Sequence, residues 1–444
     1  MTSKATNLTT VKKTSPKETI PEEKIPSPPQ KDPIEEQIHT SIDNFFITGP
    51  GGTGKTWLVK SLEKTWKKVD TKYVLLTPTG VAAVNIGGQT IHRFFSIGLA
   101  NGTKEQLLIR CRKMGGFNKI MPLQIIVIDE ISMVSAELLD IIDYICQQIR
   151  KCPEPFGGIR MIFTGDFCQL KCVQGTFCFS SSLWKDLKLQ VIQLDQPKRF
   201  NDLSYWKMLN RARIGQLKYK DVERLKQRME AYAKLTPSKK PTNSNTNDTT
   251  SIKIEPTILL SYKAEVFEMN NNKLQELPGT CYIFKAQDFV TRECDEMLDM
   301  MAPKIVTLKI GAQVMCTRNI DTDSGICNGS RGVVINCTID TVKVLFKNDI
   351  VLDITVQTWE LEGQGFTARR MQIPLILAYA LTIHRVQGLT LDCAVLDLGS
   401  SIFTPAQAYV ALSRVRNYES LYLSDFAVKS IYANKLAVDY YDTI

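Results

Sequence analysis

One stretch of the chain restricts the possible folds more than any other. A short apolar run at residues 45–48 leads into a glycine-rich turn and then into Lys55 and Thr56. This fits the pattern G-x-x-x-x-G-K-[ST], in which backbone N–H groups wrap phosphates at the start of a helix whose dipole favours anions. We expect Lys55 to reach the β- and γ-phosphates and Thr56 to bind Mg²⁺. The sequence therefore predicts a nucleoside triphosphatase that uses ATP and Mg²⁺, rather than a turn without a ligand, and its predicted phosphate cradle is Gly49, Pro50, Gly51, Gly52, Thr53, Gly54, Lys55 and Thr56.

Two acidic residues, Asp129 and Glu130, directly follow a continuous apolar run at residues 124–128. A strand that is apolar on both faces is typical of a parallel sheet covered by helices, and such sheets place ligands at the carboxyl ends of their strands. We expect Asp129 to hold Mg²⁺ through its water shell and Glu130 to orient and polarise the attacking water. Gln169 follows the next predicted strand and is a candidate sensor of the γ-phosphate, although most glutamines are simply surface amides.

Composition narrows the choice of partner. The chain of 444 residues has a formal net charge of +9, and residues 1–40 add six Lys and six Asp or Glu, so the excess lies in the remainder. A net positive charge on an ATPase suggests a polyanionic partner. A basic surface that binds no polyanion is about as common as one that does. No apolar run approaches the roughly 18 residues of a membrane span. The 12 cysteines have no zinc-binding spacing, which favours free thiols in a reducing compartment.

The turn after the second predicted strand, at residues 73–77, is a candidate nucleic-acid contact. Thr79, His92 and Phe94 could hydrogen-bond phosphates or stack on bases from this position. The alternative is an ordinary strand–helix turn with a core pair of phenylalanines, and spacing alone favours that alternative.

These motifs together closely resemble the PIF family of DNA helicases, relatives of RecD in the 5′-to-3′ branch of superfamily one. The resemblance covers residues 40–430, with two gaps of weak similarity. The segments that carry it are residues 79–83, 87–92, 128–133, 136–140, 155–159, 165–170, 311–315, 328–332, 380–390 and 407–414.

The resemblance implies an α/β fold with two RecA-like P-loop domains, a small wedge insertion, and an SH3-like β-barrel insertion in the second domain. The implied division is a disordered tail at 1–40, a first domain at 41–195 with the wedge at 97–120, and a second domain at 196–444. Within the second domain we expect a disordered insertion at 234–257, which is rich in Thr, Asn, Ser, Lys and Pro, and the barrel at 328–372.

The resemblance also implies an ATP-dependent 5′-to-3′ DNA helicase that acts on single-stranded and tailed duplex DNA. We expect it to act as a monomer and in the nucleus, with the cytoplasm or a viral replication site as alternatives. Arg199 and Arg414 are the candidates that reach across to the γ-phosphate of ATP bound by the first domain. Gln37 is a candidate reader of adenine, although its spacing from the first strand is short. Gly388 is assigned to the nucleotide, and the DNA contacts are Thr79, His92, Phe94, His384, Gln387 and Thr390.

Three departures from the family pattern concern DNA contact and coupling. Arg385-Val386 stands where the family usually has Lys-Ser, Lys171-Cys172 where it has Pro-Pro, and Arg199-Phe200 lacks the glutamine that normally follows. Two alternatives therefore stay open. One is an ATP-gated nucleic-acid clamp or remodeller that does not separate strands, and the other is a P-loop ATPase that acts on protein partners.

Overall fold

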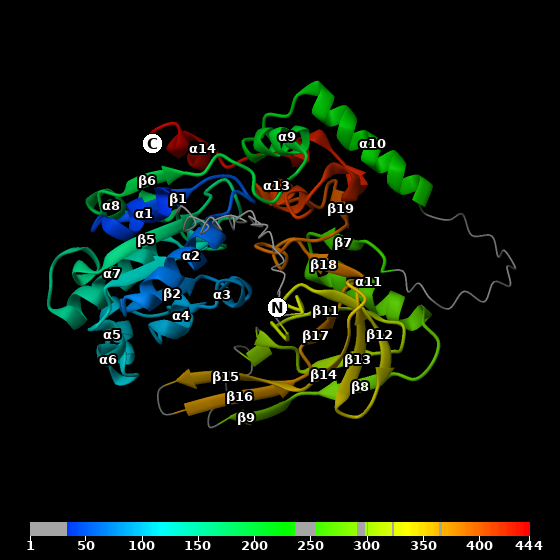
Figure 1. The fold of residues 1–444 in the computed structure, drawn as a ribbon, viewed down its shortest axis with the longest axis horizontal. Coiled ribbons are helices and arrows are strands. Elements are labelled where there is room, and N and C mark those ends of the chain that lie inside the picture. The colour runs from blue at the N-terminus through cyan, green and yellow to red at the C-terminus, as the bar shows by residue number, and fades with distance from the viewer. Residues whose placement is uncertain (1–32, 236–253, 291–297, 300, 322–323, 364–365) are drawn as a thin grey trace, which may run out of the picture.

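The first half of the chain builds a parallel sheet with the strand order β3-β2-β4-β5-β1-β6 (Figure 1). The computed structural model describes residues 33–235, 254–290, 298–299, 301–321, 324–363 and 366–444. The strands of this sheet are β1 (Phe45–Thr48), β2 (Tyr73–Thr77), β3 (Gln89–Thr90), β4 (Ile125–Ile128), β5 (Arg160–Gly165) and β6 (Gln190–Gln193).

Helices cover both faces of this sheet, which is why its central strands are apolar throughout. On β1, Phe46 packs into the core on one face, whereas Ile47 packs on the other against α2. The helices of this half are α1 (Pro33–Thr40), α2 (Lys55–Lys68), α3 (Gly80–Ile86), α4 (Ile91–Phe94), α5 (Lys104–Lys113), α6 (Gly116–Ile120), α7 (Ala136–Arg150) and α8 (Ser182–Asp186).

The predicted disordered tail at 1–40 is wrong for its last eight residues, which form α1. Ile38 is fully buried, and the Glu35 carboxylate accepts hydrogen bonds from Ser61 and Thr65 on α2 at 2.7 and 3.1 Å. These contacts hold α1 in place. Its polar composition resembles that of the residues before it, so the sequence did not predict the helix. Residues 1–32 lie outside the described part of the chain.

Residues 97–120, predicted as a wedge insertion, contain α5 and α6. Leu107, Leu108, Cys111 and Ile120 are buried in the core that α7 shares. The segment is therefore anchored on the first sheet, while Phe117 and Leu99 are exposed.

The second half contains a parallel sheet with the order β18-β7-β19-β20. Its strands are β7 (Thr257–Leu260), β18 (Ala380–Thr382), β19 (Ala394–Leu398) and β20 (Leu421–Phe426), and its helices include α9 (Leu203–Arg213), α10 (Tyr219–Leu235), α11 (Lys263–Glu276) and α13 (Gln407–Leu412). The disordered insertion expected at 234–257 is wrong at both ends, because α10 runs to Leu235 and β7 begins at Thr257. Residues 236–253 lie outside the described part.

Antiparallel strands form a third region (lower right in Figure 1). A five-stranded sheet has the order β14-β13-β12-β11-β17, a three-stranded sheet the order β15-β16-β9, and β10 pairs with β8. Only β12 to β16 lie within the predicted insertion at 328–372, so the antiparallel region extends beyond those bounds on both sides. The strands are β8 (Tyr282–Lys285), β9 (Gln287–Val290), β10 (Ile305–Leu308), β11 (Gln313–Cys316), β12 (Arg331–Cys337), β13 (Thr341–Phe346), β14 (Val351–Thr355), β15 (Gln357–Gly363), β16 (Phe366–Gln372) and β17 (Leu375–Leu377).

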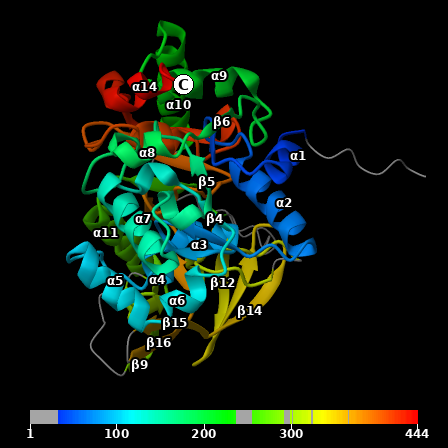
Figure 2. The ribbon, with the colours of Figure 1, turned by 90° about the vertical axis from the view of Figure 1, so that its left-hand side faces the viewer.

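The last helix, α14 (Lys435–Tyr441), follows the second parallel sheet in the sequence but packs on the first. Figures 1 and 2 both show it near α8 and α9, with the C-terminus at its end. Tyr440 and Tyr441 make the contacts, and their hydroxyls bond to Trp184 and Thr48.

Candidate nucleotide site between two parallel sheets

The glycine-rich loop connects the end of β1 to the start of α2. Lys55 is the first residue of α2, and its ammonium donates to the carbonyl oxygens of Gly49 at 2.6 Å and Pro50 at 3.0 Å. The Thr53 hydroxyl donates to the same Pro50 oxygen at 2.9 Å. Burial lowers the pKa of Lys55, and the nearby Asp166 carboxylate opposes that shift. The loop thus holds a half-buried cation where the backbone amides of a helix start are available to a phosphate.

The acidic pair lies beside the loop, at the carboxyl end of β4. The Thr56 hydroxyl donates to Asp129 Oδ2 at 3.3 Å, and the Thr164 hydroxyl donates to Asp129 Oδ1. Asp129 is 4% exposed. A hydroxyl and a carboxylate that converge in this way suit Mg²⁺, which binds few protein oxygens and keeps several waters. Thr56 and Asp129 therefore fit the predicted magnesium site, and among the described residues no cluster of three or more His, Cys, Asp or Glu offers an all-protein metal site.

Glu130 occupies a left-handed backbone conformation, with φ of 55°. Burial raises the pKa of its carboxyl group, and the neighbouring Asp129 adds to the shift. Glu130 is half-buried. Carboxyl groups whose pKa is raised by desolvation and by a like charge are common at functional sites, because such shifts suit proton transfer.

The second sheet contributes residues to the same site. Gln387 Nε2 donates to Glu130 Oε2 at 3.2 Å, so this amide, which we predicted to contact DNA, lies instead on the acidic residue. Gly388 follows with φ of 79°, and a Cβ there would lie 3.2 Å from Asn85 Nδ2. Glycine suits this position because the chain is left-handed and approaches α3 closely.

A cavity of about 330 Å³ opens between the two sheets. Its lining combines residues from the first half with residues from the second, which are Thr56, Lys60, Ala82, Asn85, Asp129, Glu130, Arg199, Asn319, Cys327, Asn328 and Gly388. Predicted site residues far apart in the sequence thus meet around one volume.

Two further contacts connect the glycine-rich loop to the second half. The Gly51 amide donates to the Tyr409 hydroxyl at 2.8 Å, and a Cβ on Gly52 would lie 2.6 Å from the Phe200 ring. Sequence reasoning did not assign Tyr409 or Asn85 to the site. Tyr409 stands in the segment 407–414 that carried the resemblance, but only the fold shows that its hydroxyl reaches a loop 358 residues earlier.

The two candidate arginines differ in their surroundings. Arg199 is half-buried next to the loop, and its Nη1 donates to the Ser413 carbonyl at 3.1 Å. Arg414 donates to the carbonyls of Val410, Val386 and Leu389 and to the Ser413 hydroxyl. Burial, with repulsion from Arg199, lowers the pKa of Arg414 to about 9. Arg199 lines the cavity, whereas Arg414 is held within the second half by backbone acceptors.

The remaining nucleotide candidates are less central. Gln169 is 6% exposed and follows Asp166 in the loop after β5. Its backbone N–H donates to the backbone carbonyl of Asp166. Gln37 is exposed on α1.

Among the predicted DNA contacts, Phe94 requires a correction. Its ring is 6% exposed and packs edge-to-face on Phe95 with centroids 5.0 Å apart, so it is a core residue and not a base-stacking one. Thr79 caps α3 by accepting from the Ala82 amide, and His92 is half-buried on α4, with burial lowering its pKa. Thr390 is also half-buried.

A stack of aromatic rings lies at the carboxyl edge of the second sheet. Tyr262 follows β7 and stacks on Phe403 with centroids 5.1 Å apart, and His384, after β18, stacks on Phe403 at 6.2 Å. Tyr262 and Phe403 are 45% and 51% exposed. Rings with accessible faces can stack on bases without regard to sequence. Only His384 of this stack was predicted, because the other two belong to no motif that the sequence analysis had assigned a role.

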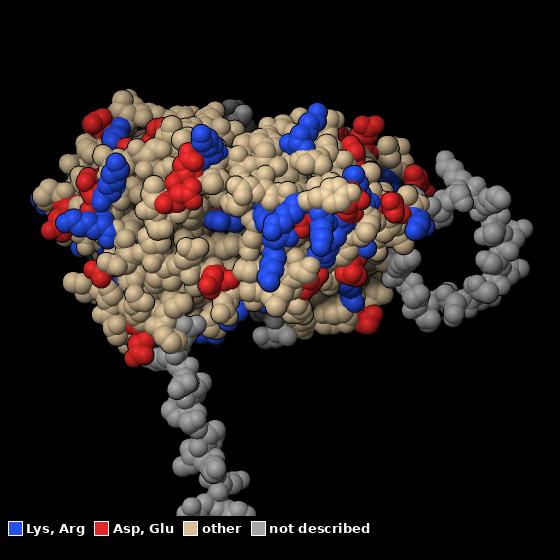
Figure 3. Space-filling view, turned by 90° about the horizontal axis from the view of Figure 1, so that it is seen from above, with Lys and Arg blue, Asp and Glu red and all other residues tan. Residues whose placement is uncertain are grey.

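The face seen from above carries interspersed acidic and basic side chains (Figure 3). The net charge of +9 is therefore not concentrated in one continuous basic stripe on that face. In the part of the chain that the structure describes, no helix is both long and apolar enough to cross a membrane.

The fold and the site define a class: a P-loop protein with two RecA-like parallel sheets that share one nucleotide site. A family model described as "PIF1-like helicase" matches residues 30–217, and one described as "DNA helicase Pif1, 2B domain" matches residues 297–337. The chain belongs to the PIF1-like helicase family of superfamily one.

Curated relatives and solved structures agree with this assignment. The ATP-dependent DNA helicase Pif1 of Bdellovibrio bacteriovorus is 30% identical over 94% of this chain and 91% of its own length. The ATP-dependent DNA helicase PIF1 of Danio rerio is 34% identical over 90% of this chain, but the chain spans only 61% of that relative. The Candida albicans Pif1 crystal structure matches with a TM-score of 0.79 and 30% identity, over 92% of this chain and 97% of that one. A Bacteroides Pif1 structure with ADP-AlF₃ and single-stranded DNA matches with a TM-score of 0.66 and 26% identity, over 93% and 96%.

Proposed function

We propose that this protein is an ATP-dependent DNA helicase that moves 5′-to-3′ on single-stranded DNA and unwinds duplex ahead of it. The observation that carries the proposal is the Gln387–Glu130 hydrogen bond, because it joins the acidic pair of the first sheet to the second sheet. Because both sheets contribute residues to the site, ATP binding and hydrolysis depend on the position of one sheet relative to the other. The helicase relatives and the DNA-bound Bacteroides structure support DNA as the partner.

In the proposed site the first sheet binds the nucleotide. The loop amides of Gly52 to Thr56 and the Lys55 ammonium would hold the phosphates, and Thr56 and Asp129 would hold Mg²⁺. When bound, Mg²⁺ neutralises phosphate charge that develops during transfer. The Glu130 carboxylate orients the attacking water and accepts its proton, and a raised pKa makes this group a stronger base.

The second sheet senses and completes the site. Arg199 lines the cavity and supplies positive charge toward the γ-phosphate, while Gln387 fixes the direction of the Glu130 carboxylate. We assign Gly388 to close approach rather than to side-chain chemistry. Binding of ATP favours the closed arrangement of the sheets, and hydrolysis with product release relaxes it.

DNA lies across the carboxyl edges of both sheets in this proposal. The Tyr262–Phe403–His384 stack holds a base on the second sheet, Thr79 and His92 contact the strand on the first, and Thr390 adds a hydroxyl. Alternate grip by the two sheets during closure and opening produces net movement. The segment at 97–120 separates the strands, because its helices are anchored while Phe117 is exposed at 52%.

The test uses three duplexes at equal concentration, one with a 5′ single-stranded tail, one with a 3′ tail and one blunt, each with and without ATP. We expect unwinding of the 5′-tailed duplex alone and only with ATP. Unwinding of the 3′-tailed duplex would contradict the direction. ATPase activity stimulated by single strands without unwinding would identify an ATP-gated clamp, and ATPase activity without DNA stimulation would favour a protein partner.

The family departure at Val386 lends the clamp no support. Its side chain is fully buried in the second core, so a hydroxyl there would face the interior and not a DNA strand. We further propose that the chain acts as a monomer and in the nucleus, the latter supported by the vertebrate and yeast relatives.

A further inference from the structure

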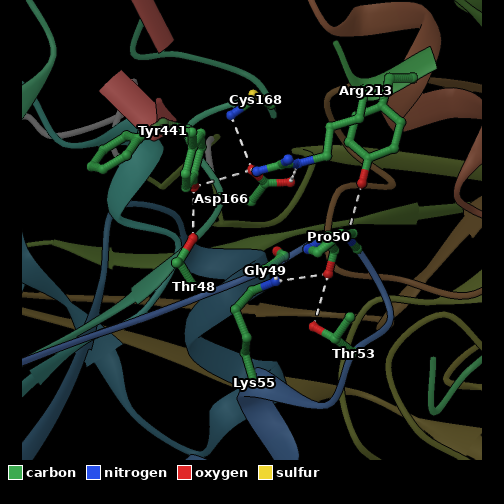
Figure 4. A network of polar contacts seen from close by, with 12 residues as sticks. Thr48, Gly49, Pro50, Thr53, Lys55, Asp166, Cys168, Arg213 and Tyr441 are labelled. Carbon is green, nitrogen blue, oxygen red and sulfur yellow. Dashed lines mark hydrogen bonds and ion pairs between the residues drawn. The ribbon is translucent and has the colours of Figure 1, made fainter. Parts of the chain in front are cut away.

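The C-terminal helix α14 places a tyrosine hydroxyl beside Thr48, the residue that precedes the glycine-rich loop (Figure 4). Tyr441 OH lies 2.6 Å from the Thr48 hydroxyl, accepts from the Phe167 amide at 3.0 Å and donates to Asp166 Oδ1 at 3.3 Å. Thr48 ends β1 and precedes the loop, and Asp166 and Phe167 follow β5. One hydroxyl from the end of the chain therefore joins the carboxyl ends of two adjacent strands.

The same tyrosine belongs to a buried charged group. Arg213, at the end of α9, forms an ion pair of 2.7 Å with Asp166, and its guanidinium lies 4.5 Å from the centre of the Tyr441 ring. Burial opposes ionisation of Asp166, but Arg213 outweighs it and holds the pKa of that carboxyl below its usual range. Among the charged groups near Lys55, Asp166 has the largest effect on the pKa of the Lys55 ammonium, and it raises that pKa.

The neighbouring Tyr440 offers a built-in comparison. Its hydroxyl accepts from Trp184 Nε1 at 2.9 Å, and its ring stacks on Phe179 at 4.3 Å. These contacts belong to the aromatic core of the first sheet, and Tyr440 has no described bond to the glycine-rich loop or to Asp166. Both tyrosines anchor α14, but only Tyr441 touches the strand ends at the nucleotide site.

We propose that Tyr441 is a positioning residue for ATP. Its hydroxyl fixes the position of the glycine-rich loop relative to Asp166. This inference rests on the proposed function in taking ATP as the ligand. The hydroxyl holds the Thr48–Gly49 junction against the start of the β5 loop, so Asp166 stays aligned to attract Lys55 into the loop. Without it the ring still fills its site, but the two strand ends lose their shared hydrogen-bond partner.

The test compares Tyr441→Phe with Tyr440→Phe in the full chain. KM and kcat are measured for ATP hydrolysis with saturating single-stranded DNA, together with the Kd of a fluorescent ATP analogue and the Tm. We expect Tyr441→Phe to raise KM and Kd about three- to tenfold, the size of one lost hydrogen bond, with kcat within about twofold. Tyr440→Phe is expected to leave KM and Kd unchanged, even where it lowers Tm as much.

A second variant, Thr48→Val, removes the partner hydroxyl. If the two groups act together, the double variant raises KM no further than the larger single effect, since coupled residues are non-additive. A wild-type KM in Tyr441→Phe would overturn the inference, as would equal KM increases in both tyrosine variants. A wild-type chain that hydrolyses ATP without unwinding DNA would remove the helicase proposal and leave this one intact, whereas a chain that binds no ATP would remove both.

Discussion

Gln387 Nε2 donates a 3.2 Å hydrogen bond to Glu130 Oε2, although 257 residues separate them. Glu130 lies two residues after β4 of the first parallel sheet, and Gln387 follows β18 of the second. The bond ties the group proposed to activate water to the part of the molecule proposed to move on DNA. Hydrolysis and movement are coupled most directly at such a contact, because shifting one sheet changes the surroundings of the carboxylate.

Replacement of Glu130 by glutamine separates nucleotide binding from hydrolysis. The amide keeps the shape of the side chain but cannot accept the proton of the attacking water, so we expect ATP affinity within about threefold of wild type and kcat lowered at least about 100-fold. Equilibrium binding of a fluorescent ATP analogue and steady-state phosphate release measure the two effects. Loss of binding together with loss of folding would show that the carboxylate is structural.

The pH dependence of kcat reports the state of Glu130. Burial and Asp129 raise the pKa of its carboxyl group, and the Gln387 hydrogen bond lowers it, because the amide stabilises the charged form. The ionised base is required, so activity falls as pH falls through this raised pKa. Gln387→Leu removes the stabilising bond, and we expect the acid limb of the profile to move to higher pH. Gln148→Leu, at an exposed site on α7, is the control and is expected to keep the wild-type acid limb. If both variants show the same acid limb, the limb does not report the ionisation of Glu130.

Replacement of Lys55 by alanine removes the half-buried cation of the loop. We expect hydrolysis to fall at least about 100-fold, because charge stabilisation of transferring phosphate is lost. Lys64→Ala removes a charge of the same kind from the exposed side of α2 and is expected to hydrolyse ATP normally. Wild-type turnover in Lys55→Ala would show that the loop does not bind the triphosphate.

The two arginines are expected to fail in different ways. Arg414 donates to three backbone carbonyls, and Arg414→Met leaves that of Leu389 without a described partner while those of Val410 and Val386 each lose one donor. We expect this change to lower the free energy of unfolding by about 3 kcal/mol. Arg199→Met is expected to lower kcat at least about 100-fold while changing stability less, since the Arg199 side chain makes one described hydrogen bond. Chemical denaturation and steady-state ATPase assays on both variants check this, and an Arg414 variant that is stable but inactive would reverse the two roles.

Removal of the Tyr262 ring tests the aromatic stack. We expect Tyr262→Ala to weaken binding of single-stranded DNA about five- to 150-fold, because stacking of one base on one ring contributes about 1–3 kcal/mol and about 1.4 kcal/mol is tenfold in affinity. Fluorescence anisotropy with a labelled oligonucleotide measures the affinity. Tyr219→Ala, which removes a 78% exposed ring from α10, should bind normally. Equal weakening in both variants would show that the stack is not a specific contact.

Much of the first sheet could be predicted from the sequence. The strands at 45–48, 73–77, 125–128 and 160–165 are short apolar runs, and the residues at their carboxyl ends supplied the loop, the acidic pair and Gln169. Such local patterns are readable because hydrophobic period and glycine placement act over a few residues. The same logic could not separate α1 from the polar tail, because Glu35 and Ile38 are held by α2 and not by their neighbours in sequence.

The tertiary structure alone decided which of these residues meet. Phe94 stands in a motif-like turn, yet packing against Phe95 places it in the core. Gln387 read as a DNA contact, yet the approach of the second sheet places it on Glu130. Sequence by itself determined the chemistry available, a phosphate loop and two carboxylates on a parallel sheet. The fold determined the partners, because contacts such as Tyr409 with Gly51 and Tyr441 with Thr48 join residues more than 350 positions apart, for which no local pattern exists.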